Sequence, residues 1–422
     1  MPEPCRLSAT EAARQMRAGT LAPEELLESC LGRIAAREAV VHAFVHLDAD
    51  AVRAALARAC EGPLHALPIG VKDILDVAEM PAAYGSPIWQ GLRPRADAAA
   101  VAWARAAGAV VLGKTVTTEF AFRKPGPTAN PHDPRRTPGG SSSGSAAGVA
   151  DYFFPFAFGT QTGGSVIRPA AFCGVVGYKP SFGLIPRAGV KLLSDGLDTI
   201  GVLARSVADC ALLAGAAGRR DLGDPDLRPP RPPRIGLCRS PNWPHAAPET
   251  QALLERATTT LGAAGAFLTT RELPDAFAAL NEAHRLVMLA QAAGSLGWEL
   301  LERRTQLSDG LREQLEWGAA QPAAALEQGL ATFARLQAAF PEVLEGLDIL
   351  LTPSTPGEAP LGLESTGDPV FNHIWTALHV PAVTVPAGEG PNGAPLGVQV
   401  IGRRGEDAAV LTWARWVAAA MG

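Results

Sequence analysis

The chain has 422 residues, of which 47% are hydrophobic and 19% are charged, and its formal net charge is −5. A chain of this length buries a core large enough to be stable without disulfides. Its charge balance, with no dense basic stretch, gives no support for nucleic-acid binding. Its 6 cysteines lack the CxxC spacing of a zinc site and do not suggest a disulfide framework.

The N-terminal part of the chain, residues 7–60, is predicted to be helical. It is rich in Ala, Glu and Arg, its apolar residues recur three and four apart, and Ser8 and Glu11 have the spacing of a capping box. The start of the chain lacks the apolar core of a signal peptide, and no apolar run is long enough to span a membrane. We therefore expect a cytoplasmic protein.

Strands and helices alternate in residues 65–225, the predicted catalytic core. The run LPIGVKDIL (67–75) indicates a strand, DAAAVAWARAAGA (97–109) a helix and VVLGKT (110–115) a second strand. This alternation predicts an α/β protein with a mixed, mostly parallel twisted sheet that helices cover on both faces.

The second half of the chain continues the same architecture. Residues 228–237 are expected to connect to a further strand, and residues 248–345 form a variable helical region on the substrate side. Residues 346–422 contain the strand runs DILLTPS, PAVTVPAG and GVQVIG and a C-terminal helix. Because no repeat or long linker divides the chain, residues 1–422 are predicted to form a single domain.

Two motifs match known signatures without the structural context that those signatures need. GAVVLGKT (108–115) has the spacing of a phosphate-binding loop, but a helix precedes it and its middle is a buried-strand run, so nucleotide binding is not expected. GSSSG (140–144) has the spacing of a nucleophile elbow with Ser142 at its centre, but no strand precedes it. A Ser-His-Asp triad with Asp368 and His373 or His379 is therefore kept as an alternative.

A second serine segment, Thr162 to Ser165, is composed of small residues. The backbone N–H groups of TGGS can converge into a concavity that binds an anionic oxygen, and Ser165 would then have a hydroxyl beside it. A plain glycine turn is the alternative.

The segments PGGSSSGSAA, GTQTGGS, RPAAFCGVVGYKPSFG and GVKD occur together in this chain. Together they resemble the amidase signature family, and the resemblance extends to PLGVQVIG near the C-terminus. It implies the single-domain fold of that family. GGSVIRP, with Arg168 three residues after Ser165, is similar to the malonamidase-like branch.

The resemblance implies a Ser-Ser-Lys triad. Ser165 would be the nucleophile, Ser141 the bridging serine after a cis Gly140–Ser141 bond, and Lys72 the base. Thr160 and Gln161 would order the hydrogen bonds of the triad. The oxyanion hole would consist of the backbone N–H groups of Thr162, Gly163, Gly164 and Ser165. The other serines of the loop, Ser142, Ser143 and Ser145, are expected to bond to local backbone groups.

Lys72 must lose its charge to act as a base. An unperturbed lysine with a pKa near ~10.4 is neutral in about one molecule in 2,500 at pH 7, a bias of ~4.6 kcal/mol. Burial at the end of a strand would remove that bias, and Asp73 would project to the opposite face. An ion pair that keeps Lys72 charged is the alternative.

The predicted activity is hydrolysis of the C–N bond of a small carboxylic amide through a serine acyl-enzyme, without a metal or an organic cofactor. Arg168 would bind a substrate carboxylate, or else form a structural salt bridge. The expected partner is a small amide, with no nucleic acid and no membrane, and a homodimer is left open.

Three other functions remain as alternatives. The glutaminase component of a tRNA-dependent amidotransferase would need partner subunits, and the segment GTQTGGSVIRP and the short chain weigh against it. A Ser-His-Asp esterase is the second alternative. A non-catalytic scaffold is the third, against which the intact Lys72, Ser141 and Ser165 argue.

Overall fold

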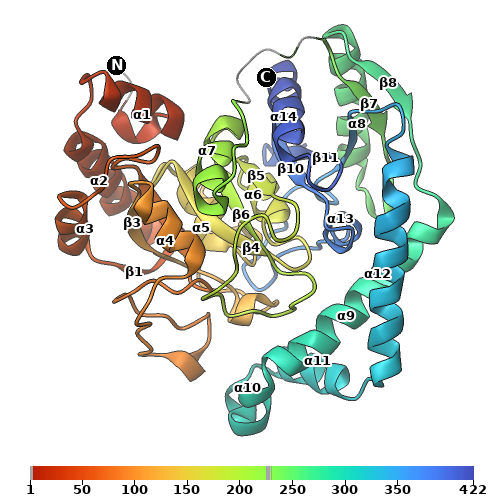
Figure 1. The fold of residues 1–422 in the computed structure, drawn as a ribbon, viewed down its shortest axis with the longest axis horizontal. Helices are drawn as coiled ribbons and strands as arrows, with labels where there is room; N and C mark the ends of the chain where they lie inside the picture. The colour runs from red at the N-terminus through yellow and green to blue at the C-terminus, as the bar shows by residue number, and fades with distance from the viewer. Residues whose placement is uncertain (1–2, 225–228, 230) are drawn as a thin grey trace.

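A computed structural model of the protein describes residues 3–224, 229 and 231–422 (Figure 1). Its strands are β1 (Phe44–Leu47), β2 (Pro68–Lys72), β3 (Val110–Thr115), β4 (Phe156–Gln161), β5 (Val176–Lys179), β6 (Thr199–Ala204), β7 (Arg234–Leu237), β8 (Phe267–Thr270), β9 (Ile349–Pro353), β10 (Ala382–Glu389) and β11 (Pro395–Ile401). They form an 11-stranded sheet in the order β1-β3-β2-β4-β6-β5-β10-β11-β9-β7-β8.

The sheet is mixed, as predicted, but less parallel than expected. In the described part of the chain, the pairs β2–β3, β2–β4, β7–β8 and β7–β9 are parallel and the other six pairs are antiparallel. The expectation of a mostly parallel sheet is corrected because β10 and β11 form a hairpin, which a short turn can close only between antiparallel strands. The hairpin inserts between β5 and β9 and is antiparallel to both.

The central strands β2, β3, β4, β6, β9 and β11 are buried at every residue, as expected of a sheet covered on both faces. The edge strands β1 and β8 are only partly buried. The sequence predicts neither of them, since they lie inside residues 7–60 and 248–345, where it indicates helices.

The helices are α1 (Ala9–Arg17), α2 (Pro23–Val41), α3 (Ala49–Leu56), α4 (Ala99–Ala106), α5 (Ser143–Ala150), α6 (Ile167–Phe172), α7 (Val207–Gly218), α8 (Pro248–Ala263), α9 (Ala279–Ser295), α10 (Gly297–Glu302), α11 (Asp309–Ala319), α12 (Ala323–Val343), α13 (His373–Ala377) and α14 (Asp407–Met421). Helices α4, α7, α14 and α8 pack side by side along the sheet, each against the next. Helices α5 and α6 contact each other and the central strands. Each helix within the described ranges is too short or too polar to span a membrane.

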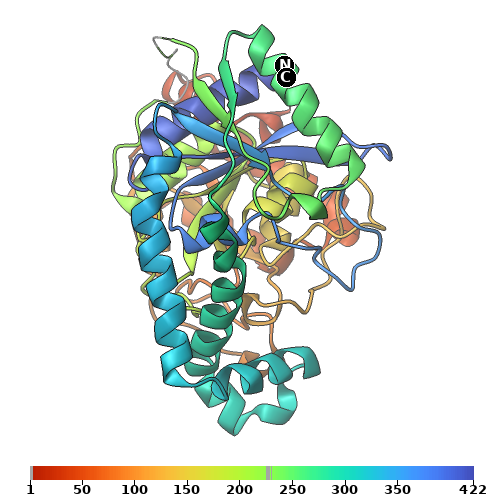
Figure 2. The same cartoon turned by 90° about the vertical axis from the view of Figure 1, so that its right-hand side faces the viewer.

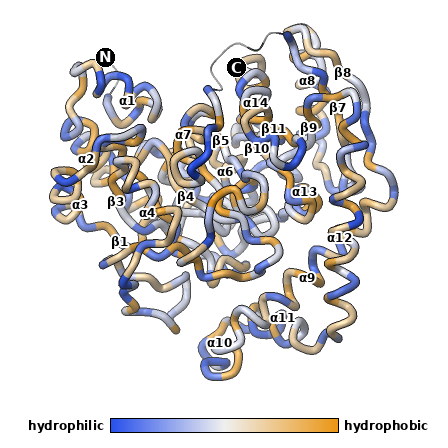
Figure 3. The backbone as a smooth tube through the Cα atoms, in the orientation of Figure 1, coloured by the Kyte–Doolittle hydropathy of each residue, from blue (hydrophilic) through white to orange (hydrophobic). Residues whose placement is uncertain are grey.

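Helices α9 to α12 project from the body as an arm, with α10 at its tip (Figures 1 and 2). Hydrophobic and hydrophilic residues alternate along α12, the pattern of a helix with one packed face (Figure 3). The tip is attached to the core by Glu299, which accepts a hydrogen bond from Trp89 Nε1 at 2.8 Å and pairs with Lys191 at 2.6 Å. A second attachment joins the backbone N–H of Ser308 to Glu119 at 3.1 Å.

Candidate active site

Lys72 is the last residue of β2 and is fully buried. Its Nζ lies 2.6 Å from Ser141 Oγ and 2.8 Å from Thr160 Oγ1. Burial holds the pKa of Lys72 well below its ordinary value, and neighbouring Arg168 lowers it further, while Asp198 opposes the shift. The amine is therefore biased toward the neutral form, in hydrogen-bond contact with one serine of the predicted triad.

Asp73, the next residue, points to the other face of the strand as predicted. It pairs with Lys114 of β3 at 2.6 Å, and both side chains are fully buried. Lys114 is the lysine of the apparent phosphate-binding motif, and it serves this buried ion pair in the middle of the sheet. The expectation that the motif does not bind a nucleotide agrees with this placement.

Ser141 follows a cis Gly140–Ser141 peptide bond, as the family resemblance implied, and is fully buried. The serines around it bond to backbone carbonyls as expected. Ser142 Oγ lies 3.3 Å from the carbonyl oxygen of Thr160, Ser143 Oγ 3.3 Å from that of Val116, and Ser145 Oγ 2.8 Å from that of Phe158. Because the Ser142 hydroxyl is engaged in this way, the nucleophile elbow suggested by GSSSG is not formed.

Ser165 lies in the loop between β4 and α6 and is 7% exposed. The loop is closed by Gln161, the last residue of β4, whose Oε1 accepts hydrogen bonds from the backbone N–H groups of Val166 at 2.9 Å and Ile167 at 3.1 Å. Gln161 thus caps the start of α6 and fixes the spacing between the end of β4 and the start of α6. Ser165 lies in the loop between them.

The loop is also anchored from outside by three side chains. His284 Nε2 lies 2.7 Å from the carbonyl oxygen of Thr162, and Thr376 Oγ1 donates to the carbonyl oxygen of Gly163 at 2.7 Å. The Thr162 hydroxyl donates to Asp198 at 2.5 Å. These anchors fix the two carbonyl groups, so the orientation of the adjoining peptide units is determined.

The N–H groups of this loop remain available. Among the described residues, no acceptor takes a hydrogen bond from the N–H of Gly163, Gly164 or Ser165. Gly164 must be a glycine because a Cβ there would lie 2.2 Å from Asn372 Oδ1. Free N–H groups beside a serine hydroxyl are what an oxyanion hole needs.

A cavity of about 580 Å³ opens over this loop. It contains cationic and anionic side chains, and all four residues of the TGGS segment line it. The other polar residues in its wall include Arg123, Arg168, Glu364, Asp368 and His373. A small polar molecule would therefore meet Ser165 and both signs of charge in one cavity.

The guanidinium of Arg168 bonds to the protein itself. It donates to the carbonyl oxygens of Gly140 at 2.7 Å and Gly367 at 3.0 Å and to Thr366 Oγ1 at 3.1 Å. Burial lowers its pKa to about 10. Arg168 thus joins the Ser141 loop to the loop at 366–367, a contact set that neither predicted role of Arg168 included.

The histidines of the alternative Ser-His-Asp triad are placed apart from Ser142. His379 Nε2 lies 2.7 Å from the carbonyl oxygen of Gly196, and its ring stacks on Phe182. His373 lines the cavity and stacks on His284, while Asp368 accepts a hydrogen bond from the backbone of Val370. These contacts do not assemble the triad. Arg123 is a site residue that the sequence does not predict, because no local motif marks it. His284 lies in residues 248–345, the region expected on the substrate side, but the sequence predicts neither its contact with the loop nor that of Thr376.

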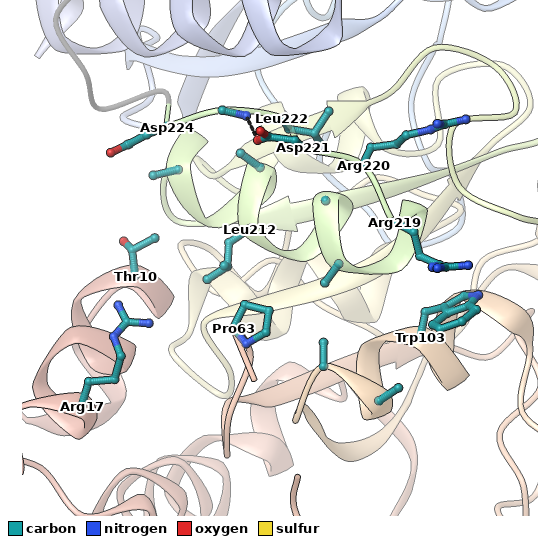
Figure 4. A pocket seen from close by; sticks show the side chains of 17 residues that line it. Thr10, Arg17, Pro63, Trp103, Leu212, Arg219, Arg220, Asp221, Leu222 and Asp224 are labelled. Atoms are coloured by element: carbon teal, nitrogen blue, oxygen red, sulfur yellow. Dashed lines mark hydrogen bonds between the residues drawn. The ribbon is translucent and has the colours of Figure 1, made fainter. Parts of the chain in front are cut away.

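A second cavity, of about 790 Å³, lies between α1, α4 and α7 (Figure 4). Thr10 and Arg17 line it on one side, and Arg219 lies over the ring of Trp103 at 4.2 Å on the other. None of the predicted site residues lines this cavity.

The fold is that of an α/β protein with a mixed sheet, and similarity to known proteins identifies its family. The family model described as Amidase matches residues 25–411. The chain belongs to this family, as the amidase signature motifs predicted, whereas the malonamidase-like branch stays a prediction. The chain is an amidase-type enzyme acting on C–N bonds.

Individual relatives cover nearly the whole chain. One component of the glutamyl-tRNA(Gln) amidotransferase from Chloroflexus aurantiacus is 33% identical, over 97% of this chain and 96% of the relative. A crystal structure described as an amidase is 31% identical, with a TM-score of 0.89, and covers 99% of this chain and 100% of its own. The peptide amidase from Stenotrophomonas maltophilia is 31% identical, with a TM-score of 0.83, covering 98% and 96%.

These relatives correct one expectation. The sequence predicts a small amide as the partner and no nucleic acid. This prediction is wrong, because the relative from Chloroflexus aurantiacus is one subunit of an enzyme named for a tRNA. The length of the chain does not argue against similarity to that relative, since the match covers 96% of the relative's length. The amino-acid composition of one subunit does not indicate what the other subunits of an assembly bind.

Proposed function

We propose that Ser165 cleaves the C–N bond of a carboxamide through an acyl-enzyme. The Ser165 oxygen attacks the carbonyl carbon, its proton passes to Ser141, and the Ser141 proton passes to neutral Lys72. The N–H groups of the loop from Thr162 to Ser165 stabilise the oxyanion. The proton on Lys72 returns through Ser141 to the leaving nitrogen, ammonia or an amine departs, and water then hydrolyses the acyl-enzyme.

One observation carries this proposal. Lys72 is buried, no carboxylate from residues 3–224, 229 or 231–422 contacts it, and its nitrogen lies 2.6 Å from the hydroxyl of Ser141. A buried amine without a counter-charge is costly for stability, and its usual explanation is that its neutral form is needed. The neighbouring Lys114, equally buried but paired with Asp73, shows what a purely structural lysine looks like in the same sheet.

The substrate that we propose is glutamine, used as a source of ammonia by an amidotransferase of which this chain is one component. Two observations support it. The relative named as an amidotransferase subunit matches over nearly its whole length. The cavity also presents Arg123 for the carboxylate of an amino acid and Glu364 and Asp368 for its ammonium group. A cytoplasmic location fits this proposal and stays a prediction.

A second candidate is hydrolysis of a small amide that is not coupled to an amidotransferase, as the sequence predicts. It is favoured by the likeness to the peptide amidase, at 31% identity with a TM-score of 0.83. The two candidates share the acyl-enzyme and differ in the amide that fills the cavity.

Ammonia release tests both candidates. The protein is incubated with L-glutamine, butanamide and an amidated dipeptide, and Ser165→Ala is the matched control. We expect ammonia from at least one amide with the wild type, and a loss of at least a thousandfold in Ser165→Ala. Equal rates in the two proteins would refute the proposed nucleophile, and a preference for the dipeptide over glutamine would favour the second candidate.

Substitutions of the two cavity arginines, Arg123 and Arg168, distinguish a role in substrate binding from a role in holding the Ser141 loop. Arg123 is exposed and makes no ion pair among the described residues, so Arg123→Gln should raise KM for glutamine roughly tenfold and leave butanamide unchanged. Arg168→Lys should lower kcat for both amides, because Arg168 holds the carbonyl oxygen of Gly140. If Arg168→Lys instead raised KM for glutamine alone, the predicted carboxylate-binding role of Arg168 would be restored.

A further inference from the structure

Two histidines that the triad does not use form a stacked pair beside the nucleophile loop. His284 comes from α9 and His373 is the first residue of α13, and their ring centroids lie 4.4 Å apart with an angle of 16° between the planes. His284 is 1% exposed, whereas His373 lines the cavity over Ser165. One histidine therefore lies behind the wall of the cavity and the other forms its surface.

The state of His284 follows from its contact. Nε2 lies 2.7 Å from the carbonyl oxygen of Thr162, and a carbonyl can only accept, so Nε2 carries the hydrogen. Burial lowers the pKa of His284 to about 4, so the ring is neutral at physiological pH. Its Nδ1 is buried without a partner among the described residues. His284 thus acts as a donor that orients the Thr162 peptide unit.

His373 has unused hydrogen-bonding capacity. A Cβ placed on Gly163 would lie 3.2 Å from His373 Nε2, so the ring borders the loop with the free N–H groups. In the described part of the chain, neither of its nitrogens makes a hydrogen bond to the protein. Burial, His284, Arg168 and Arg123 all lower the pKa of His373, and a neutral imidazole offers one donor and one acceptor.

The surroundings indicate what His373 meets. Glu364 and Asp368 also line the cavity, but the charged side chains that lower the pKa of His373 are Arg168 and Arg123, and their positive charge favours a substrate atom with negative charge beside the ring. The scissile carbonyl oxygen would occupy the N–H groups of the loop, so the partner of His373 must belong to another part of the substrate.

We propose that His373 is a specificity-determining residue that donates a hydrogen bond to a carboxylate of the amide substrate, and that His284 is a positioning residue that holds both the ring of His373 and the Thr162 carbonyl. This inference rests on the proposed amide hydrolysis at Ser165 and assigns the substrate class as amides that bear a carboxylate.

The first experiment replaces only the ring nitrogens. His373→Phe retains an aromatic ring to stack on His284, and His65→Phe, at a partly exposed position away from the cavity, is the control. A lost hydrogen bond to a charged group costs about 1.5–3 kcal/mol, so KM for glutamine should rise roughly tenfold to a hundredfold in His373→Phe. KM and kcat for butanamide, which lacks the carboxylate, should stay within about twofold. Equal changes with both amides would overturn the proposal.

A binding measurement tests the role of His373 even if neither amide is hydrolysed. L-glutamate is titrated calorimetrically into Ser165→Ala and into Ser165→Ala with His373→Phe. We expect binding to the first protein and at least tenfold weaker binding to the second. No binding to Ser165→Ala, or equal binding to both, would overturn the role of His373. Absence of ammonia release by the wild type, with the binding difference intact, would instead refute the proposed function.

The role of His284 is tested by removing and restoring its donor. His284→Leu should raise KM for glutamine, because the ring of His373 loses its stacking partner, and should lower kcat for both amides at least tenfold, because the oxyanion loop loses an anchor. His284→Gln keeps an N–H that can reach the Thr162 carbonyl and should recover most of that loss. Equal impairment in the Leu and Gln variants, at equal melting temperatures, would overturn the positioning role.

Discussion

Lys72 and Lys114 stand on neighbouring strands, and both are fully buried. Their partners differ, since Lys114 meets the carboxylate of Asp73 whereas Lys72 meets the hydroxyls of Ser141 and Thr160. The charge of the first is compensated and the charge of the second is not. Lysine therefore forms a structural ion pair in β3, whereas in β2 its amine is biased toward the neutral form that a base needs.

Replacement of each lysine by methionine should separate these roles. Lys72→Met should abolish ammonia release and change the free energy of unfolding by less than about 1 kcal/mol, because the desolvation cost of the buried amine is offset by its hydrogen bonds to Ser141 and Thr160, and both are lost together. Lys114→Met leaves the Asp73 carboxylate buried with hydrogen bonds from the backbone N–H groups of Ala83 and Tyr84 but without its counter-charge, and should cost about 3–5 kcal/mol. Chemical denaturation and activity assays measure both effects. A Lys72→Met protein as unstable as Lys114→Met would contradict this division of roles.

The local motifs point to Lys72, Ser141 and Ser165 as the triad, because each lies in a short segment that resembles the amidase signature, and this assignment stays a prediction. The contacts that hold them are not predictable in this way. Thr376 reaches the Gly163 carbonyl, and Arg168 reaches Thr366, across about two hundred residues of chain. Nothing in the local sequence marks such pairs, since they form only when distant segments pack together.

At the scale of the elements, the strands with continuous apolar runs are predictable and the edge strands are not. VVLGKT coincides with β3 and DAAVLTWARWVAAAM with α14. In β8, by contrast, Phe267 is 65% exposed and the strand has only 4 residues, so the sequence carries no pattern of burial. β1 and β8 form because a neighbouring strand offers an edge to pair with.

The arm of α9 to α12 gives a prediction at this scale. Glu299 is 1% exposed and joins the tip of the arm to Trp89 and Lys191. Glu299→Gln removes the charge that pairs with Lys191 and should speed amide hydrogen exchange in residues 296–308 roughly tenfold. Glu302→Gln, at an exposed position of the same helix, should change nothing. Equal protection in the two variants would mean that the ion pair does not hold the tip.

At the scale of the whole molecule, buried neutral histidines make folding depend on pH. The pKa of His379 is lowered to about 4 by burial, below the value of about 6.5 in an unfolded chain. The unfolded state therefore binds the proton first as the pH falls. This difference removes up to about 3 kcal/mol of stability between pH 6.5 and 4.

His379→Asn should reduce this pH dependence. Asparagine tolerates the left-handed backbone at this position, where φ is 60°, and its amide can donate to the Gly196 carbonyl as the imidazole does. The melting temperature of the variant should fall less between pH 7.5 and 4.5 than that of the wild type. Parallel curves for the two proteins would show that His379 already titrates normally in the folded state.

The anchors of the nucleophile loop have a consequence for biosynthesis. A ribosome releases Lys72, Ser141 and Ser165 in the first half of translation, but His284 and Thr376, which fix the Thr162 and Gly163 carbonyls, emerge much later. A nascent or prematurely terminated chain therefore contains the reactive groups without the frame that orients them. We therefore expect a chain that ends before His284 to release no ammonia from amides, although it retains Lys72, Ser141 and Ser165.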